Sequence, residues 1–208
     1  MAATEHPMQA LAAYLPDNTF ERVVQYLNHY KVHLTVAKER KSILGDYRNA
    51  IPGKNHRITV NGNLNKYSFL ITLIHELAHL LTYEKYGHKV MSHGKEWKNL
   101  YSSLLATFVE HKVFPVDINA ALRKSLTDPA ASSCAEEGLM RVLRKYDARN
   151  NNMHLLEELP INSFFKTADG RVFQKKEKLR KRYRGEEVKT GKVYLFSPIY
   201  EVEVIYDV

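Results

Sequence analysis

Apolar residues recur at two different spacings along this chain of 208 residues, and the spacing changes near residue 150. Before that point most apolar positions lie three or four residues apart, which predicts helices at about 20–27, 66–86, 95–108, 118–126 and 133–146. Short alternating segments predict strands at about 32–36, 47–51 and 57–60. After residue 150 only strand-like runs remain, at about 164–165, 171–173, 193–196 and 199–205.

This pattern predicts an α+β protein of two domains: a core over residues 1–150 and a small antiparallel β module over residues 151–208. A hydrophobic content of 44% and a charged content of 26% are ordinary for a soluble globular protein. No apolar run reaches the roughly 18 residues that a membrane helix needs, and the N-terminus does not have the pattern of a secretory signal. We therefore expect a cytoplasmic protein with no membrane partner, with the nucleoid as one place where it could act.

Several residues outside any motif also have expected roles. Asp17 or Asn18 is expected to cap the first helix, and Ser133 is expected to open a capping box with Glu136 three residues later. Cys134 is the only cysteine, which excludes an intrachain disulfide and suits a reducing compartment, and we expect it to be a buried, inert thiol. His56 precedes a predicted strand and is expected to be an ordinary surface histidine.

The helix predicted at 66–86 carries a His-Glu-x-x-His motif, His75-Glu76-Leu77-Ala78-His79, inside an apolar run. Because positions i and i+4 lie on one helix face, the two imidazoles can bind a single ion, and Zn²⁺ favours nitrogen ligands. Glu76 is turned about 100° from His75, where a general base for hydrolysis belongs. The alternative is a pair of core histidines that are hydrogen-bonded to the backbone.

A third ligand would distinguish a zinc site from a pair of core histidines, and three residues are candidates. Glu96 could reach the ion from a later helix, and His88 lies in the preceding loop. His93 is the better candidate, because Gly94 permits a turn after it and an amphipathic helix anchored by Trp97 begins at once. Two helical ligands, one loop ligand and one open position predict a catalytic site with one zinc ion per chain.

Positive charge is concentrated in the predicted β module. Residues 171–192 contain ten Lys or Arg and three Glu, a net charge of +7 in a chain whose total is +8. A cluster this dense is typical of a surface that contacts phosphates, and a tyrosine inside it could stack on a base. The alternative is a solvated strand face. The candidate nucleic-acid-binding residues are Lys178, Arg180, Lys181, Arg182, Tyr183 and Arg184.

The two motifs around the histidines, at residues 75–81 and 93–97, resemble the SprT-like metalloprotease family in order and spacing. This family includes bacterial SprT proteins and the eukaryotic DNA–protein-crosslink protease Spartan, and the likeness extends over roughly residues 17–200. It implies a zincin-like core made of a small sheet and the motif helix. It also implies that His75, His79 and His93 bind zinc, that Glu76 is catalytic, and that the substrates are proteins on or near DNA.

The C-terminal module departs from the family pattern. Many SprT-like proteins end in a zinc ribbon with two cysteine pairs, whereas this chain has one cysteine and resembles a ribbon that lacks its metal ligands. A second function class therefore stays open: a nucleic-acid-binding factor whose zinc site is structural or vestigial. Glu76 argues against this alternative, because a structural site has no use for a carboxylate beside its ligands.

Overall fold

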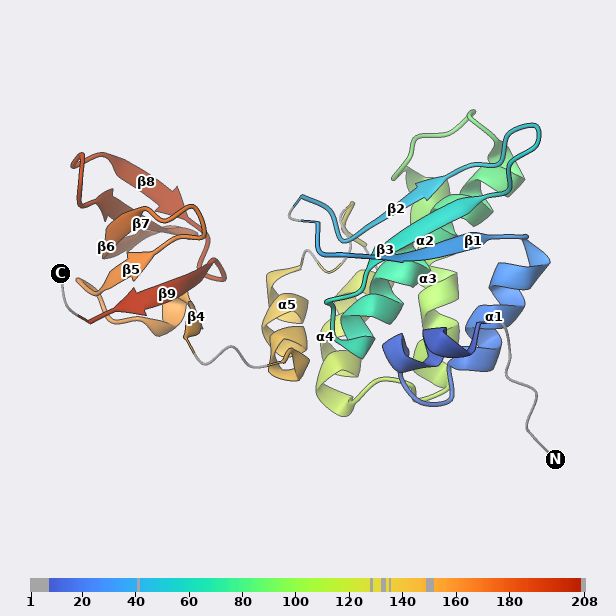
Figure 1. The fold of residues 1–208 in the computed structure, drawn as a ribbon, viewed down its shortest axis with the longest axis horizontal. Helices are drawn as coiled ribbons and strands as arrows, with labels where there is room; N and C mark the ends of the chain where they lie inside the picture. The colour runs from blue at the N-terminus through green and yellow to red at the C-terminus, as the bar shows by residue number, and fades with distance from the viewer. Residues whose placement is uncertain are drawn as a thin grey trace. The chain divides into compact units, whose positions relative to one another are not determined.

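The computed structural model describes residues 8–40, 42–127, 129–131, 134, 136–148 and 152–206. The chain forms two compact units, which divide between Asp147 and Ala148 (Figure 1). Both helices and antiparallel strand pairs are present, so the predicted α+β class is confirmed. Within the described residues, no helix combines the length and the apolar character that crossing a membrane requires.

Unit 1 places a small sheet beside a group of helices. Its elements are η1 (Gln9–Tyr14), α1 (Phe20–His29), β1 (His33–Ala37), β2 (Gly45–Arg48), β3 (Arg57–Asn61), α2 (Lys66–Tyr86), α3 (Lys95–Glu110), α4 (Val116–Thr127), α5 (Glu137–Leu143) and η2 (Arg144–Tyr146). The strand order is β1-β3-β2, with β1 parallel and β2 antiparallel to β3. Strand β2 is therefore an edge strand, and it contacts α2 along one face.

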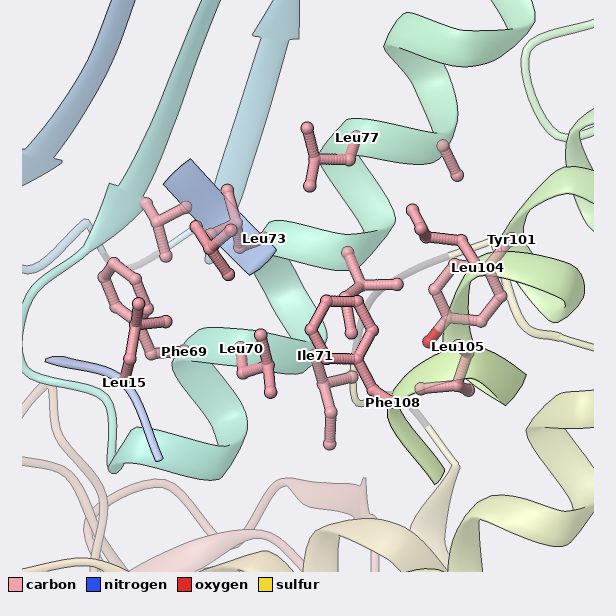
Figure 2. Close-up of a cluster of buried hydrophobic side chains, with 14 of the residues drawn as sticks. Leu15, Phe69, Leu70, Ile71, Leu73, Leu77, Tyr101, Leu104, Leu105 and Phe108 are labelled. Carbon is pink, nitrogen blue, oxygen red and sulfur yellow. The ribbon is translucent and has the colours of Figure 1, made fainter. Parts of the chain in front are cut away.

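Helix α2 is the centre of unit 1, because it contacts β2 and β3 as well as α3. The side chain of Asn65 caps its start by accepting hydrogen bonds from the amides of Tyr67 and Ser68, at 3.1 and 2.9 Å. The helix ends at Gly87, whose φ of 60° favours glycine. Between Ser68 and Thr82 nearly every residue of α2 is buried, so this part of the helix is apolar on nearly every side. Figure 2 shows Leu15 packed on one side of it and residues of α3 on the other.

Three local predictions differ from the structure. Helix α1 has Thr19 as its N-cap residue, in place of Asp17 or Asn18, and the Thr19 hydroxyl donates to the carbonyl oxygen of Pro16. The strand predicted at 47–51 lies at Gly45–Arg48, because Ile51 pairs with Lys54 in a turn. The predicted capping residue Ser133 lies outside the described residues, and α5 begins later than expected, at Glu137.

Unit 2 is an antiparallel sheet with its own small core. Its elements are β4 (Met153–Leu155), η3 (Leu156–Glu158), β5 (Phe164–Lys166), β6 (Val172–Leu179), β7 (Arg182–Glu187), β8 (Val193–Phe196) and β9 (Glu201–Ile205), and the strand order is β4-β9-β5-β6-β7-β8. The buried core contains Phe165, Phe173 and Val202. The basic stretch, predicted as a strand only up to residue 173, forms the hairpin β6–β7.

A buried lysine is part of the unit 2 core. Only 2% of Lys175 is exposed, and its ammonium donates to the carbonyl oxygen of Leu159 at 2.5 Å. The same nitrogen lies 4.0 Å from the centre of the Tyr183 ring, a cation–π distance. Burial lowers the pKa of Lys175. This lysine therefore contributes to the internal packing of the module and is not part of its outer surface.

Candidate metal centre

Three histidines converge from α2 and from the loop that follows it. His75 and His79 lie one turn apart on α2, and the Nε2 atoms of His79 and His93 lie 3.2 and 3.3 Å from Nε2 of His75. One ligand atom from each ring lies within 4.8 Å of the other two. Ligand nitrogens of a tetrahedral Zn²⁺ site, each about 2.05 Å from the ion, lie about 3.3 Å apart. The spacing of these three nitrogens thus fits one zinc ion.

A turn and a helix start position His93. The amide of Gly94 donates to the carbonyl oxygen of Met91 at 3.0 Å, which closes the turn. The amide of Lys98 donates to the carbonyl oxygen of Gly94 at 3.0 Å, so α3 begins immediately after the histidine. The local pattern that favoured His93 in the sequence therefore corresponds to a defined loop geometry.

The protonation states of the histidines suit metal binding. Burial, with the neighbouring histidines adding to its effect, lowers the pKa of His75 to about 3. Burial and the adjacent His93 lower the pKa of His79 to about 4, and burial also lowers the pKa of His93. All three rings are therefore neutral at pH 7, and neutral imidazole is the form that binds zinc.

Trp97 closes the inner side of the histidine cluster. It is fully buried, and its ring centre lies 4.7 Å from those of His75 and His93 and 5.2 Å from that of His79. Tyr101, one turn further along α3, stacks on the Trp97 ring, and the two ring centres lie 5.1 Å apart. The sequence analysis expected Trp97 to anchor α3, and its complete burial agrees with that role. Its contact with all three histidines was missed, although its position four residues after His93 could have indicated it.

Glu76 lies beside the histidines but faces the sheet. It is 5% exposed, and burial raises the pKa of its carboxyl group to about 8, with Asp46 adding to the rise and Arg40 opposing it. A cation bound at the adjacent histidines would favour the ionised form through its charge. Burial and a bound cation would therefore have opposite effects on the pKa of the Glu76 carboxyl group.

The rival ligands do not join the cluster. Among the described residues, His75, His79 and His93 form the only group of three or more His, Cys, Asp or Glu side chains spaced to hold a metal ion. His88 instead packs its ring on Tyr83, with the ring centres 5.1 Å apart. Cys134 is buried, as predicted, and burial raises the pKa of its thiol to about 12.

His56 is a correction to the sequence analysis, which expected an ordinary surface residue. It is only 6% exposed, and its Nδ1 lies 2.9 Å from the Tyr47 hydroxyl. The amide of Ala50 donates to the same nitrogen at 3.2 Å, so Nδ1 is an acceptor and Nε2 carries the proton. That Nε2 lies 3.2 Å from Oε1 of Glu84 on α2. The partners come from two segments, the end of β2 with the residues after it and α2, so the pattern around His56 alone does not reveal them.

A comparison with known protein families places this cluster in context. The model of the SprT-like family matches residues 9–119, which is more than half of the chain and includes all three histidines and Glu76. The chain belongs to the SprT-like family. No curated protein and no solved structure matches it. The SprT-like match ends within unit 1, so it does not extend to the basic hairpin, and the likeness inferred up to about residue 200 goes beyond the matched region.

The candidate nucleic-acid residues differ in their surroundings. Arg184 forms an ion pair with Glu177 at 2.7 Å, and Tyr183 packs against the unit 2 core with lysine ammonium groups near its ring. In the described part of the chain, no ion pair with a carboxylate involves the three residues at the end of the hairpin, which we call the basic turn: Arg180, Lys181 and Arg182. All three are exposed, and Arg180 has a φ of 36°, a conformation that favours glycine.

Proposed function

We propose that this protein is a zinc-dependent endopeptidase with a zincin-like core. Membership of the SprT-like family suggests a metalloprotease-like function. The observation that carries the proposal is the convergence of three neutral histidine nitrogens with a buried carboxylate next to them in the sequence. When bound, zinc supplies Lewis acidity, which polarises the scissile carbonyl and acidifies water.

The residues of the chain divide the remaining work. Glu76 accepts the proton of the attacking water and returns it to the leaving nitrogen. Trp97 excludes solvent from the inner side of the ligands, because it is fully buried against all three rings. Among the described strands, none pairs with the outer edge of β2, so its backbone can pair with an extended substrate segment.

For the substrates, we infer proteins that are bound to DNA. The likeness to SprT-like proteases suggests this class, and the charge of the C-terminal module supports it. The basic turn presents three cationic side chains at one end of a hairpin, where they can contact phosphates. Arg180 of this turn has a positive φ, a conformation in which glycine would be less strained than arginine. Specificity would then come from location more than from a side-chain pocket.

The test compares wild type with Glu76→Gln on a protein crosslinked to DNA. The substitution keeps the shape of the side chain and removes the base, so hydrolysis should fall by about 10²-fold or more while the zinc content persists. Glu110→Gln is the matched control, because Glu110 is an exposed glutamate at the end of α3. If wild type and Glu76→Gln bind DNA equally and neither cleaves the substrate, the protein is a nucleic-acid-binding factor with a structural or vestigial zinc site.

A further inference from the structure

The sheet comes close to the metal helix at Gly45, the first residue of β2. A Cβ atom at this position would lie 2.8 Å from Oε1 of Glu76 and 2.7 Å from Cγ2 of Thr72. Gly45 is not among the glycines with a positive φ, so its backbone does not itself require glycine. The position is therefore restricted by space, which the Glu76 side chain and the Thr72 methyl group occupy.

A polar network fixes the segment that leads into β2. The guanidinium of Arg40 forms an ion pair with Asp46 and donates through Nε to Oδ1 of Asn61 at 2.8 Å. The Asn61 amide group donates in turn to the carbonyl oxygens of Arg40 and Ile43, at 3.1 and 2.9 Å. Asn61 is only 1% exposed, so the segment is joined to β3 through hydrogen bonds of a buried side chain.

A second set of contacts fastens the other end of β2 to α2. The Tyr47 hydroxyl lies 2.9 Å from His56, and His56 lies 3.2 Å from Glu84, two turns along α2 from Glu76. Tyr47 and Gly45 lie on the same face of the strand, because side chains alternate along it. The Arg40 network therefore ties the start of β2 to β3, and the Tyr47–His56–Glu84 contacts link its other end to α2.

We propose that Gly45 is a positioning residue for Glu76. The backbone of strand β2 at Gly45 limits the positions that the catalytic carboxylate can take. The proposal rests on the proposed function, because it concerns the base of that reaction. The Glu76 carboxylate lies against Gly45, so the backbone of β2 limits how far it can move towards the sheet. Residues of two separate segments, one a glycine without a side chain, thus define the geometry of the base.

The test is Gly45→Ala, measured for kcat, KM and zinc affinity. The added methyl group must displace the carboxylate or the strand, and a displacement of about 1 Å from productive geometry can cost about 10²-fold in rate. We expect kcat to fall by about 10- to 100-fold, with KM changed by less than about threefold and zinc affinity unchanged. A rise in KM at unchanged kcat would overturn the proposal, because the strand alone would then be affected. Loss of zinc would also overturn it.

Two further variants separate the contact with Glu76 from general crowding. Gly62→Ala is the matched control. A Cβ atom added at Gly62 would lie 2.7 Å from the methyl carbon Cγ1 of Val36, so the crowding is similar but does not involve Glu76. It should lower stability and leave kcat unchanged. Adding Thr72→Ser to Gly45→Ala removes the clash with the Thr72 methyl group, and it should not restore kcat. Full restoration would assign the effect to Thr72 and refute the role of Glu76.

A structural measurement makes the inference independent of activity. Crystal structures of zinc-loaded wild type and zinc-loaded Gly45→Ala should be compared. The Glu76 carboxylate of the variant should be displaced relative to His75, while the three histidines keep their positions. An unmoved carboxylate would overturn the positioning role even in an active enzyme. A displaced carboxylate in a protein without peptidase activity would support the positioning role and sink the proposed function instead.

Discussion

Acid should destabilise zinc-free unit 1, and Glu76 should mask about half of the effect of the two helical histidines. Between about pH 5 and 6 an unfolded chain carries protons on His75 and His79 and none on Glu76, given ordinary pKa values of 6.5 and 4.5. The folded chain carries the opposite set, because the pKa values are about 3 and 4 for the histidines and about 8 for the glutamate. The unfolded state therefore binds about one more proton, two from the histidines less one from Glu76.

This proton difference sets the size and the sign of the pH dependence. The free energy of unfolding should rise with pH by about 1.4 kcal/mol per pH unit in this window, and it is lost on acidification. Glu76→Gln removes the opposing proton, so its slope should be about twice as steep, about 2.7 kcal/mol per pH unit. Between about pH 7 and 8 only Glu76 still differs between the states, so wild type should lose stability as the pH rises, and Glu76→Gln should not.

Urea unfolding of chelator-treated protein at a series of pH values measures these slopes. Fluorescence of Trp97 is a suitable signal, because it is the single tryptophan of the sequence and lies buried in unit 1. His93 also has a lowered pKa and adds the same contribution to both proteins, so the quantity to compare is the difference between their slopes. Equal slopes in wild type and Glu76→Gln would refute the reasoning, and Glu110→Gln should behave as wild type.

The other predictions concern the metal and the basic turn. Metal analysis should find one zinc per chain, which His75→Ala combined with His79→Ala removes; two ions, or one that survives this change, would contradict the site. His93→Ala should lose most of the zinc affinity and His88→Ala almost none, as isothermal titration can show, and the reverse order would exclude His93 as the third ligand. Reversing the charge of the basic turn should reduce the slope of a log–log salt titration of DNA binding by about two to three units, at unchanged zinc content. Wild-type binding that does not depend on salt would mean that the turn is only a solvated surface.

The parts of the site that the sequence predicted are those that local spacing determines. His75 and His79 share a helix face because they are four residues apart, and His93 is placed by the glycine and the helix start that follow it. The limits of α2 were predicted for a similar reason, since its apolar run is long and its end is marked by Gly87. Each of these features is determined by residues that are close to it in the sequence.

The parts that were missed depend on segments that are distant in the sequence. His56 lies against Glu84 of α2 as well as its nearer neighbours Tyr47 and Ala50, and Gly45 is informative only when Glu76 is known to lie against it. The hairpin β6–β7 was missed for a different reason. Its charged residues hide the alternation of faces, which becomes visible only once Lys175 is seen to point inward with Phe173.

Lys175 also gives the chain an internal chemical reporter. Reagents that acylate amines in water should modify the exposed lysines of unit 2 first, because the ammonium of Lys175 is enclosed and bonded to the backbone. Its modification would follow the opening of unit 2, as the fluorescence of Trp97 follows that of unit 1. Trp97 in unit 1 and Lys175 in unit 2 therefore allow the unfolding of each unit to be timed separately within the intact protein.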